Sequence, residues 1–337
     1  MDLSPRVSTS SEMYGLGLPK IDVSIVIIAA RFSAVLEESL AAIAELSGPV
    51  IETIVVLDDV FESADGTVRY LASGPVGPAE KRDIGARSAR GDLLAFIDDD
   101  AYPSPGWLLA AMPLFENLDV WAVGGPGVTP PTDGFRAQVS GWTYAAWMVS
   151  GPARYRYVAQ PARRVDDYPS MNLIVRRSAF EEVGGFDSTY YPGEDTKFCL
   201  EIVRRGGQIM YDPNVLVYHH RRPVMRGHLR QISGYGWHRG YFARVFPETS
   251  RRVPYFVPTL WALWLTIGAV SVIWVDQLRL LYFLTIGIYV AAVLVSVALV
   301  VKDAGRFWLG VAVGPTIVLS HLVYGFRFLG GLAKFRR

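Results

Sequence analysis

Three long apolar tracts near the end of the chain constrain its fold more than any other feature. The tracts are Val253–Val275, Leu280–Val301 and Phe307–Leu332. About 20 residues at a rise of 1.5 Å span a hydrocarbon core of roughly 30 Å, so each tract is long enough to cross a membrane. The first two contain no charged residue, and the third contains His321 and Arg327. We therefore expect residues 253–337 to form an all-α membrane domain with about three transmembrane helices. The alternative is a buried helical bundle in a soluble domain, but three such tracts in series are difficult to bury.

The formal net charge of +1 over 337 residues conceals three regions of different charge. The net charge is −11 over residues 1–218, +7 over residues 219–252 and +5 over residues 253–337. A general nucleic-acid binder would be basic overall, so no nucleic-acid partner is expected. The single cysteine, Cys199, excludes an intrachain disulfide framework and a cysteine-rich zinc site. The sequence leaves the oligomeric state open.

Residues 221–252, called the basic collar below, interleave basic with aromatic and apolar side chains. Arg230, Trp237 and Arg239 belong to this pattern, and we expect them to contact lipid or a lipid-linked acceptor. The pattern predicts one or two interfacial helices on anionic headgroups, although ordinary juxtamembrane anchoring would produce it as well.

The distribution of basic residues gives an incomplete prediction of membrane topology. The basic collar favours the cytoplasmic side for the residues that precede it, so we expect a multi-pass protein of the cell membrane with a cytoplasmic catalytic domain. Three spans would then place the basic stretch Lys334–Arg337 outside, against the positive-inside rule. Either the collar dominates or one tract is re-entrant, and the sequence leaves both open.

Residues 21–220 alternate between strand and helix patterns. Short apolar runs predict buried strands at Val23–Ile28, Ile51–Leu57 and Asp92–Ile97. Helices are predicted between them, at Val35–Leu46 and Ala79–Ala89. This alternation predicts an α/β domain with a mostly parallel sheet and helices on both faces. Residues 1–20 are polar, carry no signal-peptide pattern and are expected to be an N-terminal extension.

Clustered aspartates follow two of these strands. Asp98, Asp99 and Asp100 repel one another unless they are solvated or neutralised, and a divalent cation is the obvious neutraliser. Mn²⁺ or Mg²⁺ prefers oxygen ligands, and residues two apart on an extended segment face the same side, so Asp98 and Asp100 can act together. The alternative is an acidic surface turn.

A second group of polar residues suits a nucleotide. Asp58 and Asp59 end the second strand, where a carboxylate can accept hydrogen bonds from a ribose or base. Lys81 and Arg82 open the next predicted helix and could meet phosphate or pair with the aspartates. A simple turn at the aspartates and a solvated helix face at the basic pair remain alternatives.

The ordered motifs of residues 21–220 resemble a family-2 glycosyltransferase of the GT-A fold, an inverting enzyme. The resemblance rests on the Asp58-Asp59 strand end, the Asp98–Asp100 cluster after Gly91–Ile97, and Pro105–Leu108. Further on it rests on the segments Val183–Asp187 and Gly193–Thr196. The first strand runs into Ala29-Ala30-Arg31 instead of the family's usual turn, and the Gln-x-x-Arg-Trp signature of processive members is absent.

The resemblance implies a role for each matching residue. Asp58, with Asp59, Lys81, Arg82, Asp98 and Asp99, would bind the nucleotide, and Asp98 and Asp100 would hold Mn²⁺ or Mg²⁺. Asp195, next to Glu194, would be the catalytic base, although acidic residues also favour the first turn of a helix. Trp107, Gly184 and Gly185 would shape the acceptor side. His219 or His220, after a predicted strand at Val215–Tyr218, would complete the metal site or touch the diphosphate, or else be a structural strand-end histidine.

These residues together predict a metal-dependent inverting glycosyltransferase anchored in a membrane. We expect it to move a sugar from a nucleoside-diphosphate sugar to a membrane-borne acceptor. A polyprenyl-(di)phosphate-linked glycan is the expected acceptor class, within cell-envelope polysaccharide or glycoconjugate assembly. The alternatives are a processive polysaccharide synthase and an inactive nucleotide-binding scaffold.

Overall fold

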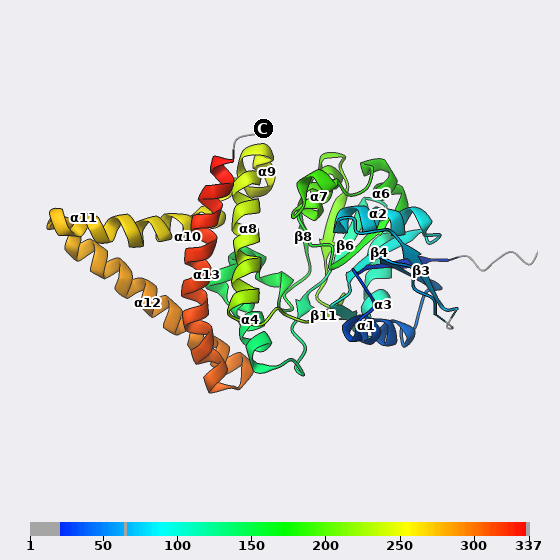
Figure 1. Ribbon diagram of the computed structural model, residues 1–337, viewed down its shortest axis with the longest axis horizontal. Helices are drawn as coiled ribbons and strands as arrows, with labels where there is room; N and C mark the ends of the chain where they lie inside the picture. Colours follow the sequence, from blue (N-terminus) through cyan, green and yellow to red (C-terminus); the bar gives the residue numbers. More distant parts are fainter. Residues whose placement is uncertain (1–20, 64–65, 335–337) are drawn as a thin grey trace, which may run out of the picture.

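The structure is a computed structural model that describes residues 21–63 and 66–334. The predicted N-terminal extension, residues 1–20, lies outside the described residues. The described chain has two parts, which Figure 1 shows side by side: an α/β domain and a group of long C-terminal helices. Both parts contribute walls to the cavity described below.

An eight-stranded mixed sheet forms the centre of the α/β domain, in the order β3-β2-β1-β4-β9-β6-β10-β8. Strands β1 to β4 are parallel, β9 is antiparallel to both of its neighbours, and β8 is antiparallel to β10. The sheet is therefore mostly parallel, as predicted. The strand bounds are β1 Val23–Ile28, β2 Ile51–Leu57, β3 Val68–Ala72, β4 Leu93–Asp98, β6 Val120–Gly124, β8 Arg163–Val165, β9 Asn172–Arg176 and β10 Gln208–Tyr211.

Helices cover both faces of this sheet because its central strands are apolar on both sides. Val26 and Ile28 of β1 pack toward α2, α6 and α7, whereas Val23, Ile25 and Ile27 pack toward α1 and α3. Successive side chains of a strand point to opposite faces, which explains this division. The helix bounds are α1 Ala34–Ala44, α2 Pro78–Ser88, α3 Trp107–Ala111, α6 Arg177–Val183 and α7 Glu194–Arg204.

A small three-stranded sheet, ordered β5-β11-β7, lies beside the ends of the main strands. Its strands are β5 Ala101–Pro103, β7 Gly127–Val128 and β11 Val217–His219. β11 is antiparallel to β5, and His219 is in register with Ala101. This pairing carries His219 back to the Asp98–Asp100 turn from more than 100 residues away along the chain.

The remaining helices connect the α/β domain to the apolar part of the chain. Their bounds are α4 Phe135–Ala145, α5 Trp147–Ser150, α8 Arg226–Val245, α9 Pro247–Ser250, α10 Val253–Leu263, α11 Ala269–Trp274, α12 Gln277–Ala304 and α13 Phe307–Ala333. A π-helical stretch, Trp264–Gly268, joins α10 to α11. Short 3₁₀ helices occur at Met112–Glu116, Gly151–Arg156 and Ser188–Tyr190.

The basic collar folds mainly into α8, which packs lengthwise against α13 (Figure 1). The prediction of a helix is correct, but α8 has a protein neighbour along its length. Glycines make this contact close: a Cβ on Gly240 would collide with the carbonyl oxygen of Phe328, and one on Gly236 with that of Tyr324. Small residues at such contacts let two helix backbones approach closely.

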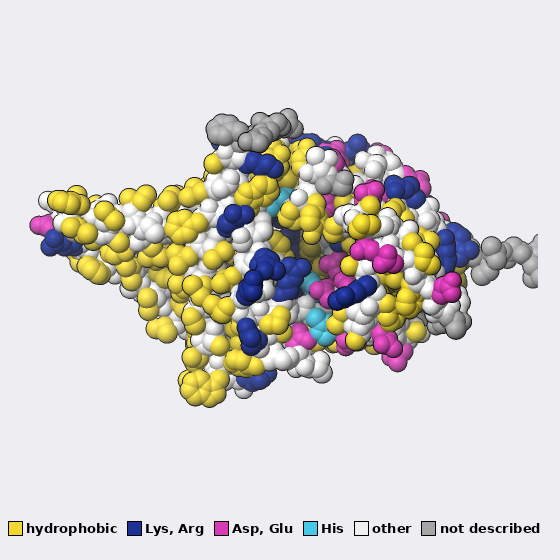
Figure 2. Space-filling view, in the orientation of Figure 1, with side chains coloured by type: hydrophobic (Ala, Val, Ile, Leu, Met, Phe, Trp, Pro, Cys, Tyr) yellow, Lys and Arg dark blue, Asp and Glu magenta, His cyan; other side chains and the backbone are white. Residues whose placement is uncertain are grey.

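Three helical segments of the described residues are long and apolar enough to cross a membrane. They are Val253–Trp274, Gln277–Ala304 and Phe307–Ala333. The first two have only 17% of their apolar window buried within the protein, whereas the third has 50%. Side chains of the first two therefore present a broad apolar surface, which Figure 2 shows as the part of the molecule farthest from the α/β domain.

Candidate functional site

A cavity of about 1600 Å³ lies between the α/β domain and the C-terminal helices. One wall consists of strand ends and loops of the α/β domain, including Asp58 and Asp98. The opposite wall consists of residues of α8, α10, α12 and α13, including Tyr235 and Trp261. Figure 2 shows this hollow with acidic, basic and histidine side chains around it.

Asp98, Asp100 and His219 form a candidate metal site at the α/β wall. One ligand atom from each lies within 4.8 Å of the others. Nε2 of His219 lies 3.1 Å from Oδ1 of Asp100, and Arg221 donates a hydrogen bond of 3.0 Å to Nδ1 of His219. Burial opposes the charge on Asp100, but His219 outweighs it and lowers the pKa of that carboxyl. Two carboxylates and one imidazole suit Mn²⁺ or Mg²⁺, so the donor set fits the predicted cofactor.

His220, which also lines the cavity, has both ring nitrogens in use elsewhere. Nδ1 lies 2.6 Å from Asp133, and Nε2 lies 3.0 Å from Glu38. Despite partial burial, these two carboxylates raise the pKa of His220. The prediction left both histidines as candidate ligands, and the geometry favours His219. His220 instead joins α1 to the loop before α4.

The middle residue of the acidic cluster has a different environment. Burial, followed by the charges of Asp100 and Asp98, raises the pKa of Asp99 to about 6. Asp99 lines the cavity but does not belong to the cluster of three metal-ligand side chains.

Lys81 and Asp58 form an ion pair at the end of β2 that faces the cavity. Lys81 is buried and also donates a hydrogen bond of 2.5 Å to the carbonyl oxygen of Ala29. The aspartate is therefore oriented by a fixed cation. Lys81 pairs with an aspartate and is buried, so the alternative of a solvated helix face is wrong for this residue, while its predicted contact with phosphate stays a prediction.

Arg82, one residue further along α2, connects two parts of the site. Its Nη2 donates to Asp98 at 2.8 Å, and its Nη1 donates to Glu194 at 2.9 Å. Arg82 is only 6% exposed. Burial opposes its charge, but Asp98 and Glu194 outweigh burial and raise the pKa of the guanidinium.

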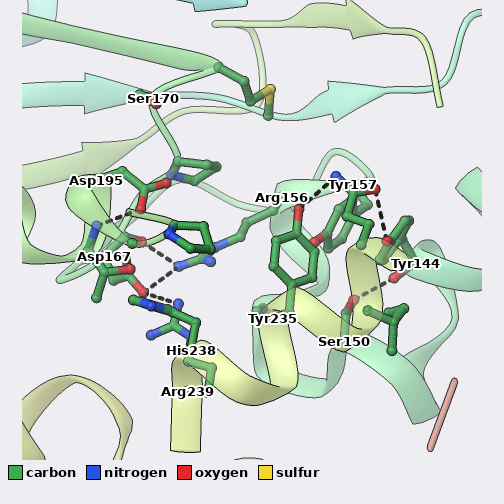
Figure 3. Close-up of a pocket in the computed structure, with 18 of the residues that line it drawn as sticks. Tyr144, Ser150, Arg156, Tyr157, Asp167, Ser170, Asp195, Tyr235, His238 and Arg239 are labelled. Carbon is green, nitrogen blue, oxygen red and sulfur yellow. Dashed lines mark hydrogen bonds and ion pairs between the residues drawn. The ribbon is translucent and has the colours of Figure 1, made fainter. Parts of the chain in front are cut away.

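Asp195 occupies the first turn of α7 and faces the cavity (Figure 3). Burial, and then the charges of Glu194 and Asp167, raise the pKa of Asp195 to about 7. A carboxylate with this pKa can accept a proton near neutral pH. Glu194 also lines the cavity, and its carboxylate accepts hydrogen bonds from Arg82 and from the backbone N–H of Gly193.

A buried ionic cluster beside Asp195 was not found by the sequence analysis. Asp167 accepts hydrogen bonds from Arg239 at 2.5 Å and from the hydroxyl of Thr196 at 3.1 Å, and Arg156 lies 3.3 Å away (Figure 3). Burial opposes the charge of Asp167, but Arg239 and Arg156 outweigh it and lower the pKa of that carboxyl. Arg239 was predicted to contact the acceptor or lipid, and it does line the cavity.

Tyrosines form the next part of the cavity wall. Tyr144 stacks on Tyr157 with ring centroids 5.1 Å apart, and the guanidinium of Arg221 lies 5.2 Å from the Tyr157 ring. Tyr144 also donates to the side chain of Gln231 at 3.1 Å, which in turn donates to the hydroxyl of Tyr235. The alternation of Arg and Tyr in residues 154–157 was the available signal, but no spacing rule connects it to residues of α8.

Several predicted site residues lie away from the cavity. Trp107 is fully buried in the core, and its indole N–H donates to Asn172 at 2.8 Å, so its predicted contact with an acceptor is corrected to a structural role. Gly184 and Gly185 form the turn after α6 and do not line the cavity. Asp59 is exposed and outside the cavity.

The remaining two residues of the basic collar that were assigned to lipid or acceptor lie outside the cavity as well. Arg230 is exposed on α8. Trp237 stacks with Tyr241 at 5.8 Å, and the ammonium of Lys334 lies 4.6 Å from its ring. Neither position excludes a contact with membrane lipid, so that part of the prediction stays a prediction.

Comparison with known proteins finds a family match within the α/β part. The profile of the family described as "Glycosyl transferase family 2" matches residues 24–184. The "Pre-mycofactocin glycosyltransferase" of two strains of Mycobacterium tuberculosis is 31% identical over 161 residues, which are 48% of this chain and 33% of that protein. The "Glucosyl-dolichyl phosphate glucuronosyltransferase" of Haloferax volcanii is 26% identical over 188 residues, which are 50% of this chain and 59% of that protein. The chain thus spans a third of the length of the first relative and three fifths of the second.

A solved structure shares the fold over nearly the whole chain. It is a mannosyltransferase from Pyrobaculum calidifontis in complex with GDP-Man and Mn²⁺, with a TM-score of 0.52 and 18% identity. The similarity covers 92% of this chain and 87% of that one. The GT-A-like fold followed by long C-terminal helices is therefore confirmed.

Proposed function

We propose that this chain, whose residues 24–184 form a glycosyl transferase family 2 domain, transfers a sugar from a nucleoside-diphosphate donor to a membrane-borne acceptor. One observation carries the proposal. A single cavity joins the Asp98–Asp100–His219 cluster to Asp195 and continues to the apolar helices α10, α12 and α13. Donor, base and a membrane-embedded acceptor can therefore meet in one space.

The donor binds at the α/β wall. Asp58, oriented by Lys81, accepts hydrogen bonds from the ribose or base. Asp98, Asp100 and His219 would hold Mn²⁺ or Mg²⁺, and the ion would supply positive charge that stabilises the diphosphate. Arg82 lies beside Asp98 and fixes the direction of that carboxylate.

Asp195 is the general base of the reaction. It accepts the proton of the acceptor hydroxyl as the hydroxyl oxygen attacks the anomeric carbon from the side opposite the diphosphate. The bond from that carbon to the diphosphate oxygen breaks in the same displacement, so the anomeric configuration inverts. An aspartate with a pKa of about 7 is deprotonated often enough and basic enough for this task.

The acceptor enters from the membrane side. The relative from Haloferax volcanii is named for a dolichyl-phosphate-linked acceptor. In this chain Val257, Trp261 and Tyr289 of the apolar helices line the cavity, and the guanidinium-bearing residues Arg239 and Arg252 line it as well. Apolar walls suit a polyprenyl chain and guanidinium groups suit its phosphate, so a polyprenyl-(di)phosphate-linked glycan of the cell envelope is the acceptor class we propose.

The arrangement also supports a location. The basic collar and the three long apolar helices support a position of the α/β domain at a membrane surface. The positive-inside rule makes the cytoplasmic face the proposed side, with a nucleotide sugar as the soluble substrate.

Transfer in isolated membranes tests the proposal. A panel of nucleotide sugars is incubated with membranes that contain the full chain, and sugar incorporated into the lipid fraction is measured with and without Mn²⁺. We expect one donor to give metal-dependent transfer of one sugar, and expect Asp195→Asn and Asp98→Ala to abolish it. Asp59→Asn, which alters an exposed carboxylate outside the cavity, is the matched control. Unchanged transfer in both site variants would refute the assignment, and a ladder of long products would favour a processive synthase.

A further inference from the structure

We propose that only two of the three apolar segments cross the bilayer: Val253–Trp274 and α12 form a transmembrane hairpin, while α13 lies along the membrane surface beside α8. Three observations carry this inference: the charges at the ends of the hairpin, the lengthwise packing of α13 on α8, and the sides on which basic residues fall. The inference concerns the membrane topology and does not depend on the chemistry proposed above.

The hairpin has the dimensions of two crossings. Residues 253–275 and 280–301 contain no charged residue, and 22 residues at 1.5 Å rise extend about 33 Å. The turn between them carries Asp276 and Arg279, which form an exposed ion pair of 2.9 Å. Figure 1 shows α10 and α11 running away from the α/β domain and α12 returning toward it. A charged turn at the tip of an apolar hairpin indicates that the tip emerges on the far side of the bilayer.

Helix α13 runs in a different direction, together with α8 (Figure 1). Contacts repeat along both helices in the same order: Gly236 faces Tyr324, Gly240 faces Phe328, and Arg244 donates to the carbonyl oxygen of Leu332 at 2.8 Å. The two helices are therefore parallel and occupy the same depth along this contact.

That shared depth excludes α13 as a crossing helix. Arg226, Arg230 and Arg244 are exposed and are distributed along the length of α8. A membrane-spanning α13 would place these guanidinium groups at successive depths of the hydrocarbon, where exposed arginine is strongly unfavourable. At the membrane surface the same groups meet anionic headgroups.

The polar and apolar sides of α13 agree with a surface position. His228 of α8 lies 3.0 Å from the hydroxyl of Ser320 and 2.8 Å from that of Ser140, so it joins α13 to α4 of the α/β domain. The outward side carries the exposed apolar residues Trp308, Val311 and Phe326. Helix α13 thus has one side packed against protein and an apolar side that faces outward. This pattern is typical of a helix that lies in the membrane–water interface.

The resulting topology also removes the conflict in the distribution of basic residues. With α13 on the surface, Lys302, Arg306 and Lys334 lie on the same side of the bilayer as the basic collar. Of the charged residues that the structure describes after the basic collar, only Asp276 and Arg279 lie on the far side of the bilayer. This distribution satisfies the positive-inside rule, which three crossings do not.

Single-cysteine labelling tests the topology in the full chain. The only native cysteine, Cys199, is buried, so the unaltered protein is the unlabelled control. Exposed positions are changed one at a time: Gln277→Cys at the tip, Lys302→Cys at the end of α12, Ala333→Cys at the end of α13 and Glu116→Cys in the α/β domain. Each variant is treated with a membrane-impermeant maleimide in sealed vesicles of both orientations.

We expect Lys302→Cys, Ala333→Cys and Glu116→Cys to be labelled in the same vesicle orientation and Gln277→Cys in the opposite one. Labelling of Ala333→Cys together with Gln277→Cys would mean that α13 crosses the bilayer and would overturn the inference. Labelling of all four positions in one orientation would also overturn it, because then no segment crosses. The labelling pattern does not require activity, so it is independent of the glycosyltransferase proposal.

Discussion

The guanidinium of Arg82 lies 2.9 Å from the carboxylate of Glu194, which is 112 residues further along the chain. A second nitrogen of the same group contacts Asp98 at 2.8 Å. Arg82 thus connects the candidate metal site at the end of β4 with α7, which begins at Glu194 and carries the proposed base Asp195 in its first turn. Its own burial makes this connection rigid.

Loss of Arg82 should therefore affect both ends of the site. Arg82→Met leaves Glu194 buried without its cation, which costs about 3–5 kcal/mol for a broken buried pair. Arg82→Lys keeps the charge but reaches only one partner well, so a smaller loss is expected. The measurement is thermal unfolding of the detergent-solubilised protein. Arg87→Lys, an exposed position on the same helix, is the control, and an equal shift in both lysine variants would argue against a special role for Arg82.

The metal site can be tested separately from activity. Asp98→Asn, Asp100→Asn and His219→Gln each remove a ligand and should weaken Mn²⁺ binding by at least roughly 100-fold, more than second-shell changes do. His220→Gln should leave binding unchanged within a few-fold, because both of its nitrogens already contact carboxylates. Free Mn²⁺ is measured by electron paramagnetic resonance. Equal losses in the two histidine variants would contradict the assignment of His219.

The raised pKa of Asp195 predicts how activity depends on pH. Because burial and neighbouring carboxylates raise its pKa to about 7, kcat/KM should increase as the pH rises through 7 and then reach a plateau. The same shift has an opposite effect on stability: a carboxyl whose pKa is higher in the folded state stabilises the fold at low pH and loses this contribution as the pH rises through 7. Asp195→Asn should therefore gain stability relative to the unaltered protein as the pH rises from about 4 to about 7, and the difference should level off above that. A pH-independent difference between the two proteins would be evidence against the shift.

For the Asp167 cluster we expect the reverse dependence of stability on pH, because the pKa of Asp167 is lowered in the folded protein. Asp167→Asn leaves two buried guanidinium groups without their shared carboxylate and should cost about 3–5 kcal/mol at neutral pH. Because the pKa of Asp167 is lowered in the folded protein, its contribution is present above about pH 4 and is lost as the pH falls below that value. The neighbouring Asp166→Asn breaks only an exposed pair with Arg252 and should cost less than about 1 kcal/mol. Equal unfolding temperatures for both variants would show that burial of the cluster is not important.

The contact between α8 and α13 can be tested by adding single methyl groups. Gly240→Ala places a Cβ against the carbonyl oxygen of Phe328 and should cost about 1–3 kcal/mol, as overpacking does. Gly234→Ala on the same helix meets open space, so its higher helix propensity should stabilise the protein by about 0.5–1 kcal/mol. Opposite signs in thermal unfolding are expected, and equal signs would contradict the close contact.

Local patterns were sufficient to predict the central strands of the fold. β1 and β2 have the predicted bounds, and the helices beside them differ by one or two residues at their ends. Short apolar runs bounded by aspartates are unambiguous where a strand is buried on both faces. The antiparallel strand β9 could not be placed in the sheet in this way, because pairing partners are set by long-range packing.

The site was predictable only where a residue belongs to a local sequence motif. Asp58, Asp98, Asp100 and Asp195 belong to local motifs, and all four line the cavity. Asp167 does not belong to a local motif. Its importance comes from its contacts with Arg239 of α8 and Arg156 of a 3₁₀ helix. Trp107 was wrongly assigned to the site. It lies within a motif, but its indole is buried in the core and donates a hydrogen bond to Asn172. A motif therefore identified the neighbourhood of the site, and side-chain direction decided which of its residues take part.

The two walls of the cavity come from different parts of the molecule, so the cavity is complete only when both parts have folded against each other. The α/β wall alone presents the candidate metal ligands and Asp195, whereas Tyr235 and Arg239 belong to α8 and the apolar lining belongs to α10, α12 and α13. A chain that has left the ribosome without inserting lacks half of its binding space. Under the proposed function, insertion would complete the cavity, so the donor would meet a complete site only at the membrane that holds the acceptor.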